Sequence, residues 1–196
     1  MALTDATAST VLPTEYAGIV FRSRLEARWA VILDKVGARW QYEPEGYRLP
    51  SGSYLPDFLL PDLSCYLEIK PEVADQAERD RIEQLARELA LVTGRTIFVA
   101  WGLPDPRYVD QNGPNPHVYS DYAGGKVTRN DDGWDNHYTL TRCPNCGSVG
   151  FVFEGRAERL AHATGCWVRE SHKVYNGDDP LLLNAYEAAW RRRWYR

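Results

Sequence analysis

The stretch that most constrains this chain covers residues 54–70 and reads YLPDFLLPDLSCYLEIK. Its apolar residues predict two short strands joined by a turn at Pro61-Asp62. Three charged residues, Asp57, Glu68 and Lys70, interrupt strands that are otherwise apolar. Charged side chains are rarely buried in proteins unless they are paired or bind a metal ion. The three charges of this stretch are therefore expected to be paired with one another or to bind a metal ion.

The spacing of these three charges allows them to meet. Glu68 and Lys70 are two residues apart, so on a strand both side chains point to the same face of the sheet. If the first strand pairs beside the second, Asp57 reaches that face as well. Two carboxylates at one point raise each other's pKa unless a cation lies between them, and hard oxygen ligands with room for water suit Mg²⁺ or Mn²⁺. The alternative is an exposed Asp57 in a turn and an ordinary Glu68–Lys70 salt bridge.

The pattern resembles the PD-(D/E)xK nuclease superfamily. The motif stands here as Pro56-Asp57, then ten residues, then Glu68-Ile69-Lys70. The resemblance implies an α/β fold with a restriction-endonuclease-like core, in which helix, three strands, helix and strand follow in order. It also implies that Asp57, Glu68 and the main-chain carbonyl of Ile69 bind Mg²⁺ or Mn²⁺, and that Lys70 orients or helps to deprotonate the attacking water.

The segments around the motif fit that order of elements. An apolar stripe predicts a first helix that ends at Gly37. Three short strands are expected next, with a hairpin turn at Ser51-Gly52. Asp75 predicts the start of a second helix, and residues 96–101 predict a buried strand. The stripe of the first helix is Leu25, Trp29, Ile32 and Val36, and the apolar face of the second is Ile82, Leu85, Leu89 and Val92.

The first helix also carries candidate functional residues. Glu26 lies at the edge of the apolar stripe, and by the resemblance a Glu on this helix joins the metal site and supports a second ion. The alternative is a solvated Glu26 that pairs with Arg22 or Arg28. Arg22 and Arg24 are candidates for phosphate contacts, and their alternative is plain surface charge.

Composition divides the chain into four parts. Residues 1–17 are small and polar and predict a flexible N-terminal arm. Residues 18–102 form the expected nuclease core, and the resemblance does not extend beyond them. Residues 103–138, rich in Pro, Gly, Asn and Asp, predict a connector with a small hairpin across Gly124-Gly125. Residues 139–196 predict a zinc-binding module and a C-terminal helix.

The zinc prediction rests on cysteine and histidine spacing. Cys143 and Cys146 form a CxxC turn, and His162 and Cys166 are four residues apart on a predicted helix, so each pair can supply two ligands to a tetrahedral, structural zinc site. His172 is an alternative to His162. The remaining alternative is a redox-active or free pair of cysteines.

The chain ends with a second basic segment. Pro180 after an Asp predicts the first turn of a helix, with Leu182, Tyr186, Ala189 and Trp190 on its packed face. Arg191, Arg192 and Arg193 stand among aromatic residues, a combination that can bind phosphate and stack on bases. The alternative is a helix that packs through its Trp residues and leaves its Arg residues in water.

The sequence as a whole predicts a Mg²⁺-dependent DNA endonuclease of phage or mobile-element type. The net charge of -4 argues against non-specific coating of nucleic acid but not against a local basic site. No apolar run of membrane-spanning length and no secretory signal is visible, so a bacterial or phage-infected cytoplasm is expected, without a small-molecule cofactor. The alternatives are a non-cleaving nucleic-acid-binding adaptor and a nuclease that acts on RNA or single strands. A homodimer is expected only if the enzyme cuts both strands.

Overall fold

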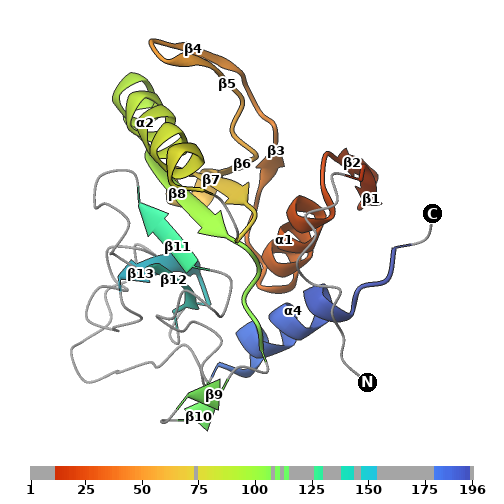
Figure 1. Cartoon of the computed structure of the whole chain (residues 1–196). Coiled ribbons are helices and arrows are strands. Elements are labelled where there is room, and N and C mark those ends of the chain that lie inside the picture. Colours follow the sequence, from red (N-terminus) through yellow and green to blue (C-terminus); the bar gives the residue numbers. More distant parts are fainter. Residues whose placement is uncertain are drawn as a thin grey trace.

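The computed structural model describes residues 12–72, 75–106, 109–110, 113–114, 126–129, 138–143, 147–153 and 179–194. These residues form a mixed α/β fold with a large mixed sheet and three helices (Figure 1). The helices are α1 (Arg24–Lys35), α2 (Gln76–Thr93) and α4 (Pro180–Arg191). The predicted α/β class is therefore confirmed.

A seven-stranded sheet runs through the molecule in the order β13-β12-β11-β8-β7-β6-β3. Only β7 and β8 are parallel neighbours, and α2 connects them, as a parallel crossover requires. The other neighbours in the sheet are antiparallel. The strands are β3 (Gln41–Tyr42), β6 (Phe58–Leu60), β7 (Cys65–Lys70), β8 (Thr96–Trp101), β11 (Lys126–Arg129), β12 (Tyr138–Arg142) and β13 (Val149–Phe153).

Three small hairpins accompany the sheet. They are β1 (Thr14–Tyr16) with β2 (Ile19–Phe21), β4 (Tyr47–Leu49) with β5 (Gly52–Tyr54), and β9 (Val109–Asp110) with β10 (Gly113–Pro114). The β4–β5 hairpin turns at Pro50-Ser51, one residue before the predicted Ser51-Gly52, because Gly52 already pairs with Leu49. Thr14 is buried in β1, so the predicted N-terminal arm does not extend through residue 17, because β1 is held by its pairing with β2. Residues 1–11 lie outside the described part.

The helices cover opposite faces of the sheet. The core on one face is built from α1, α4 and inward side chains of β6 and β7, including Trp29, Ile32, Leu67, Ile69 and Tyr186 (Figure 1). The core on the other face combines α2 with Tyr66, Val99 and Trp101. Alternate residues of β7 therefore enter different cores, which explains why this strand is buried on both sides.

Each of the three described helices begins with a side-chain cap, and the caps of α2 and α4 were predicted from the sequence. Ser23 caps α1 by accepting a hydrogen bond from the Glu26 N–H, and Asp75 caps α2 by accepting one from the Glu78 N–H. Asp179 caps α4, ahead of Pro180. One packing prediction is wrong: Val92 is 61% exposed, because the buried face of α2 ends at Leu89, one turn before the helix does.

The elements before residue 102 follow the predicted order. Along the main sheet they run α1, then β3, β6 and β7, then α2, then β8. Beyond residue 102, β11, β12 and β13 continue the same sheet. The boundary proposed there thus separates two stretches of chain but not two sheets. The predicted hairpin across Gly124-Gly125 lies outside the described residues.

Candidate active site

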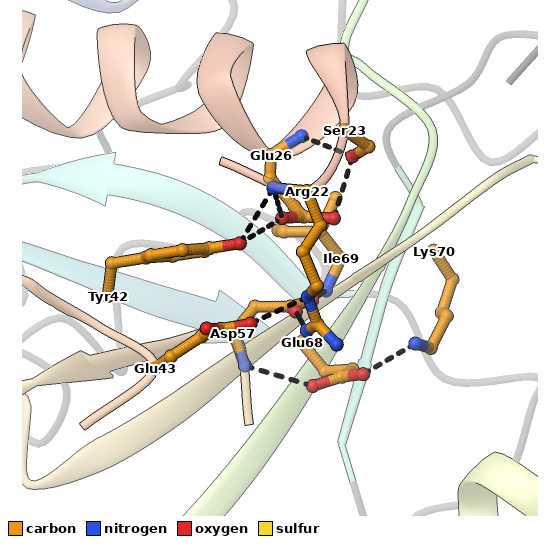
Figure 2. Close-up of polar contacts among 9 residues, drawn as sticks. All are labelled: Arg22, Ser23, Glu26, Tyr42, Glu43, Asp57, Glu68, Ile69 and Lys70. Atoms are coloured by element: carbon orange, nitrogen blue, oxygen red, sulfur yellow. Dashed lines mark hydrogen bonds and ion pairs between the residues drawn. The ribbon is translucent and has the colours of Figure 1, made fainter. Parts of the chain in front are cut away.

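The antiparallel pairing of β6 and β7 brings the two motif carboxylates together. Phe58 pairs with Leu67, so Asp57, one residue before β6, lies opposite Glu68. The Glu68 carboxylate accepts the Asp57 N–H at 3.2 Å, and the Asp57 carboxylate accepts the Ile69 N–H at 2.7 Å (Figure 2). Both residues are 1% exposed. Each carboxylate is therefore fixed by the backbone of the opposite strand.

Lys70 lies on the same side of β7 as Glu68, as the two-residue spacing predicts. Its Nζ is 2.5 Å from Glu68 Oε1 (Figure 2). Burial lowers the pKa of Lys70, but the carboxylates of Glu68 and Asp57 outweigh it and raise that pKa above its ordinary value. Lys70 is therefore an ammonium at neutral pH, with N–H groups to donate. The exposed-turn alternative for Asp57 does not hold, because its side chain is buried.

The paired carboxylates carry an electrostatic cost. Burial raises the pKa of Asp57 well above its ordinary value, and the charge of Glu68 raises it further, while Lys70 and the Ile69 N–H oppose the rise. The hydroxyl of buried Tyr54 also has a raised pKa, because of burial and then the charges of Glu68 and Asp57. A buried site of this kind is stabilised by added positive charge.

Arg22 supplies part of that charge. Its Nη2 lies 2.6 Å from Asp57 Oδ1, and its Nε lies 2.6 Å from Glu43 Oε1 (Figure 2). The Arg22 side chain is 51% exposed, whereas that of Asp57 is 2% exposed. Sequence reasoning placed Arg22 on phosphate or at the plain surface. In the structure its guanidinium lies on a motif carboxylate, at the solvent side of the site.

Glu26 is buried beside the site but is held by other partners. Its carboxylate accepts hydrogen bonds from Ser23 Oγ at 2.7 Å, the Tyr42 hydroxyl at 2.6 Å and the Arg22 N–H at 3.2 Å. Figure 2 shows the Arg22 side chain between Glu26 and Asp57. The charge of Glu26 still contributes to the raised pKa of Asp57. Glu26 is thus a neighbour of the carboxylate pair, linked to it through Arg22.

Two residues of this network were missed from the sequence, Tyr42 and Tyr54. Tyr42 orients Glu26 through its hydroxyl, and burial followed by that hydrogen bond raises the pKa of Tyr42. Glu43, which follows β3 with φ +44°, holds Arg22 through an ion pair. No pattern in the sequence indicated the contacts of Tyr42 and Tyr54, because they join separate segments of the chain.

The donor set limits the kind of metal that fits. Within the described residues, no three His, Cys, Asp or Glu side chains are grouped as metal ligands. Asp57 and Glu68 form a pair of hard oxygen donors, with the main chain of Ile69 directly beside Asp57. Mg²⁺ keeps several waters and usually binds proteins through one or two carboxylates. The pair therefore fits Mg²⁺ or Mn²⁺ better than a metal that needs a full protein cage.

The zinc prediction falls almost entirely on residues that are not described. Cys143 is buried in the turn after β12, where its C=O accepts the Gly147 N–H and its N–H donates to Ser148. Gly147 has φ +74°, which glycine adopts readily. Cys146, His162, Cys166 and the alternative ligand His172 lie outside the described residues. The zinc site remains a prediction.

The other predicted basic residues lie away from the carboxylates. Arg24 is the first residue of α1, and Arg191, Arg192 and Arg193 lie at the end of α4. Arg191 pairs with Glu187 at 2.5 Å. All four Arg residues line one groove.

The chain matches no protein-family model, no curated protein and no solved structure. None of the helices in the described ranges is long and apolar enough to cross a membrane.

Proposed function

We propose that this protein is a Mg²⁺-dependent DNA endonuclease of the PD-(D/E)xK type. The observation that carries the proposal is the buried Asp57–Glu68 pair, cross-linked through backbone N–H groups, with the Lys70 ammonium 2.5 Å from Glu68. Buried like charges at one point are costly, and a buried carboxyl with a raised pKa, as at Asp57, is typical of a functional site. The order of the elements from α1 to β8 is also the order of the superfamily core.

Each residue has a separate task in this proposal. Asp57 and Glu68, with the Ile69 carbonyl, would hold Mg²⁺, which when bound would lower the pKa of an attacking water and offset charge on the leaving oxygen. Lys70 donates hydrogen bonds and so orients that water toward the phosphorus. The Arg22 guanidinium, at the solvent side of Asp57, is placed to contact a phosphate oxygen of the substrate. Glu26 supports the site through Tyr42 and Ser23.

The reaction is hydrolysis of a phosphodiester. A water oxygen bonds to phosphorus, the bond from phosphorus to the 3′ oxygen breaks, and the water proton is passed to solvent. By resemblance to the superfamily, the products carry a 5′-phosphate and a 3′-hydroxyl. The reaction needs no oxidant and no organic cofactor.

Cleavage assays test the proposal. Purified protein is incubated with Mg²⁺, and separately with a chelator, on duplex, nicked, branched and single-stranded DNA and on RNA. We expect Mg²⁺-dependent cutting of DNA, and a fall in rate of roughly 10²–10³-fold in Asp57→Ala, the size seen when one electrostatic group of an active site is removed. Cutting that persists in Asp57→Ala would contradict the assignment.

One observation favours a second function, a non-cleaving nucleic-acid-binding adaptor. The Arg22–Asp57 ion pair already supplies a positive charge at the carboxylates, and this charge offsets part of their repulsion. The adaptor predicts equal DNA binding by the wild type and Asp57→Ala, with no cutting by either protein.

A further inference from the structure

A groove of about 1180 Å³ lies between the N-terminal hairpin and the end of α4. We call it the basic groove and define it by Tyr16 of β1, Arg24 of α1, and Arg191, Arg192, Arg193 and Trp194 at and after the end of α4. In Figure 1 the chain after α4 passes beside the β1–β2 hairpin. The rings of Tyr16 and Trp194 meet edge to face, with centroids 6.2 Å apart.

Cations outnumber anions around this groove. Arg191 is paired with Glu187, whereas Arg24, Arg192 and Arg193 make no ion pair with a described acidic residue. Of the nearby acids, Glu15 lines the groove, and Asp34 accepts a hydrogen bond from Trp40. Like charges gathered without counter-charges repel one another, so this surface gains free energy when an anion binds.

A buried cation behind the groove adds to the imbalance. Arg28, one turn after Arg24, stacks on Trp190 at 5.7 Å, and its Nε is buried without a hydrogen-bond partner. Burial, and then the charge of Arg24, lower the pKa of Arg28. Arg24 therefore lies close enough to Arg28 for their like charges to interact.

The aromatic residues hold one guanidinium in place. Arg192 lies 5.3 Å from the Tyr16 ring centroid and 5.4 Å from that of Trp194. A guanidinium stacked on rings keeps its planar N–H edge available for bonding, and this edge matches two oxygens of a phosphate. The groove thus presents oriented donors and not only diffuse charge.

The groove is close to the carboxylates along the chain. Arg22 contacts Asp57 and Arg24 lines the groove, so their Cα atoms are at most about 7 Å apart. The acidic site and the groove therefore both include residues at or just before the start of α1.

We propose that the basic groove holds the phosphodiester backbone of the substrate DNA beside the bond that is cut, through Arg24, Arg192 and Arg193. This inference rests on the proposed function for the choice of DNA as the ligand. The contacts are to backbone phosphate, so the groove fixes the position of the DNA without reading its sequence.

The test measures DNA binding without cutting. In an Asp57→Ala background, the double variant Arg24→Gln/Arg193→Gln is compared with the parent on one duplex over a series of salt concentrations. We expect weaker binding and a log K against log salt slope that is shallower by about two, one for each lost phosphate contact. Arg192 is left unchanged, because it packs between two rings.

A matched control removes the same charge elsewhere. Arg39→Gln/Arg87→Gln, in the same background, replaces two exposed Arg residues that pair with Asp62 and Glu83. We expect this control to show the same slope of log K against log salt as the parent. An equal loss in both double variants, or no binding by the parent, would overturn the proposal, because the effect would then be one of net charge or absent.

The proposal for the basic groove and the proposal of nuclease activity are tested by different outcomes. If no DNA is cut in Mg²⁺ but the slope still falls only in the groove variant, the groove is supported and the nuclease assignment is wrong. If DNA is cut and the groove variant keeps the parent slope, the nuclease assignment is supported and the proposal for the groove is wrong.

Discussion

The acidic site and the basic groove lie on either side of one short segment, Arg22 to Arg24, yet they handle charge in opposite ways. At the acidic site, both carboxylates are buried and each is bonded to a backbone N–H, a lysine or an arginine. In the groove, the arginines are largely exposed and mostly unpaired with acids. The first region resembles a site for a cation, and the second a site for an anion.

The two regions differ in how folding holds their charges. Asp57 and Glu68 are held together by strand pairing, so their repulsion is a cost of the fold itself. The groove arginines lie at the start of α1 and at and after the end of α4, where water screens their repulsion. A phosphodiester with a bound divalent cation would satisfy both regions at once.

The largest effect is expected from removing the Lys70 ammonium, which is the positive charge of the acidic site that orients the attacking water. We expect Lys70→Met to lower the single-turnover cleavage rate by roughly 10²–10³-fold, the loss typical when one hydrogen-bond donor of an active site is removed. DNA binding is expected to remain, because the groove is unchanged.

Lys35→Met is the matched control, since Lys35 is exposed at the end of α1. It should cut at the wild-type rate. Wild-type cutting by Lys70→Met would mean that the water is held by another group.

A smaller effect is expected from removing the cation that competes with the metal. Arg22→Gln frees Asp57 from its ion pair, so Mg²⁺ no longer has to displace a guanidinium. We expect the Kd for Mg²⁺, measured by titration calorimetry without DNA, to fall by about tenfold, or about 1.4 kcal/mol.

Arg39→Gln removes a similar ion pair, with Asp62, away from the site and should leave the Kd unchanged. Weaker Mg²⁺ binding in Arg22→Gln would instead show that Arg22 positions Asp57 for the metal.

The smallest effect concerns stability. The pKa of Asp57 is raised in the folded state, so ionised Asp57 disfavours folding, and this cost grows as pH rises from the ordinary value of 3.8 through the raised value. In a chelator at neutral pH, Asp57→Asn is expected to raise the stability by about 1 kcal/mol, or about 2–4 °C in Tm. The gain should shrink as pH falls.

Asp62→Asn is the control, because the pKa of exposed Asp62 is shifted in the opposite direction: the Arg39 guanidinium lowers it. Its Tm should not rise. A lower Tm for Asp57→Asn than for the wild type would mean that the Arg22 ion pair outweighs the burial of Asp57.

The sequence predicted those parts of the site that lie close together in the chain. The turn between β6 and β7 is short, so the approach of Asp57 to Glu68 follows from apolar patterning alone. The contacts of Arg22 with Asp57 and of Tyr42 with Glu26 join separate segments, and no spacing rule reports such contacts. Their discovery needed the packing of α1 against the sheet.

The same limit applies to the fold. The apolar stripes of α1 and α4 were visible as periodic residues, and most of the predicted members are buried. The predicted stripes were too narrow, because Val31 and Leu33 of α1 and Ala185 of α4 are buried as well. The extension of the sheet by β11 to β13 was not, because the chain between Leu103 and Tyr138 is rich in turn-forming residues and its pairing with β8 is non-local. Val92 shows that periodicity does not tell where packing stops.

The brevity of β6 has a consequence for how this molecule tolerates change. With only three residues in that strand, the two hydrogen bonds made by the Asp57 and Glu68 carboxylates contribute a large share of its attachment to β7. Sliding one strand past the other by a single residue would turn Glu68 to the opposite side of the sheet. The correct register of β6 and β7 and the pairing of the two carboxylates therefore form together, and a chain that folds with a shifted register lacks the acidic site.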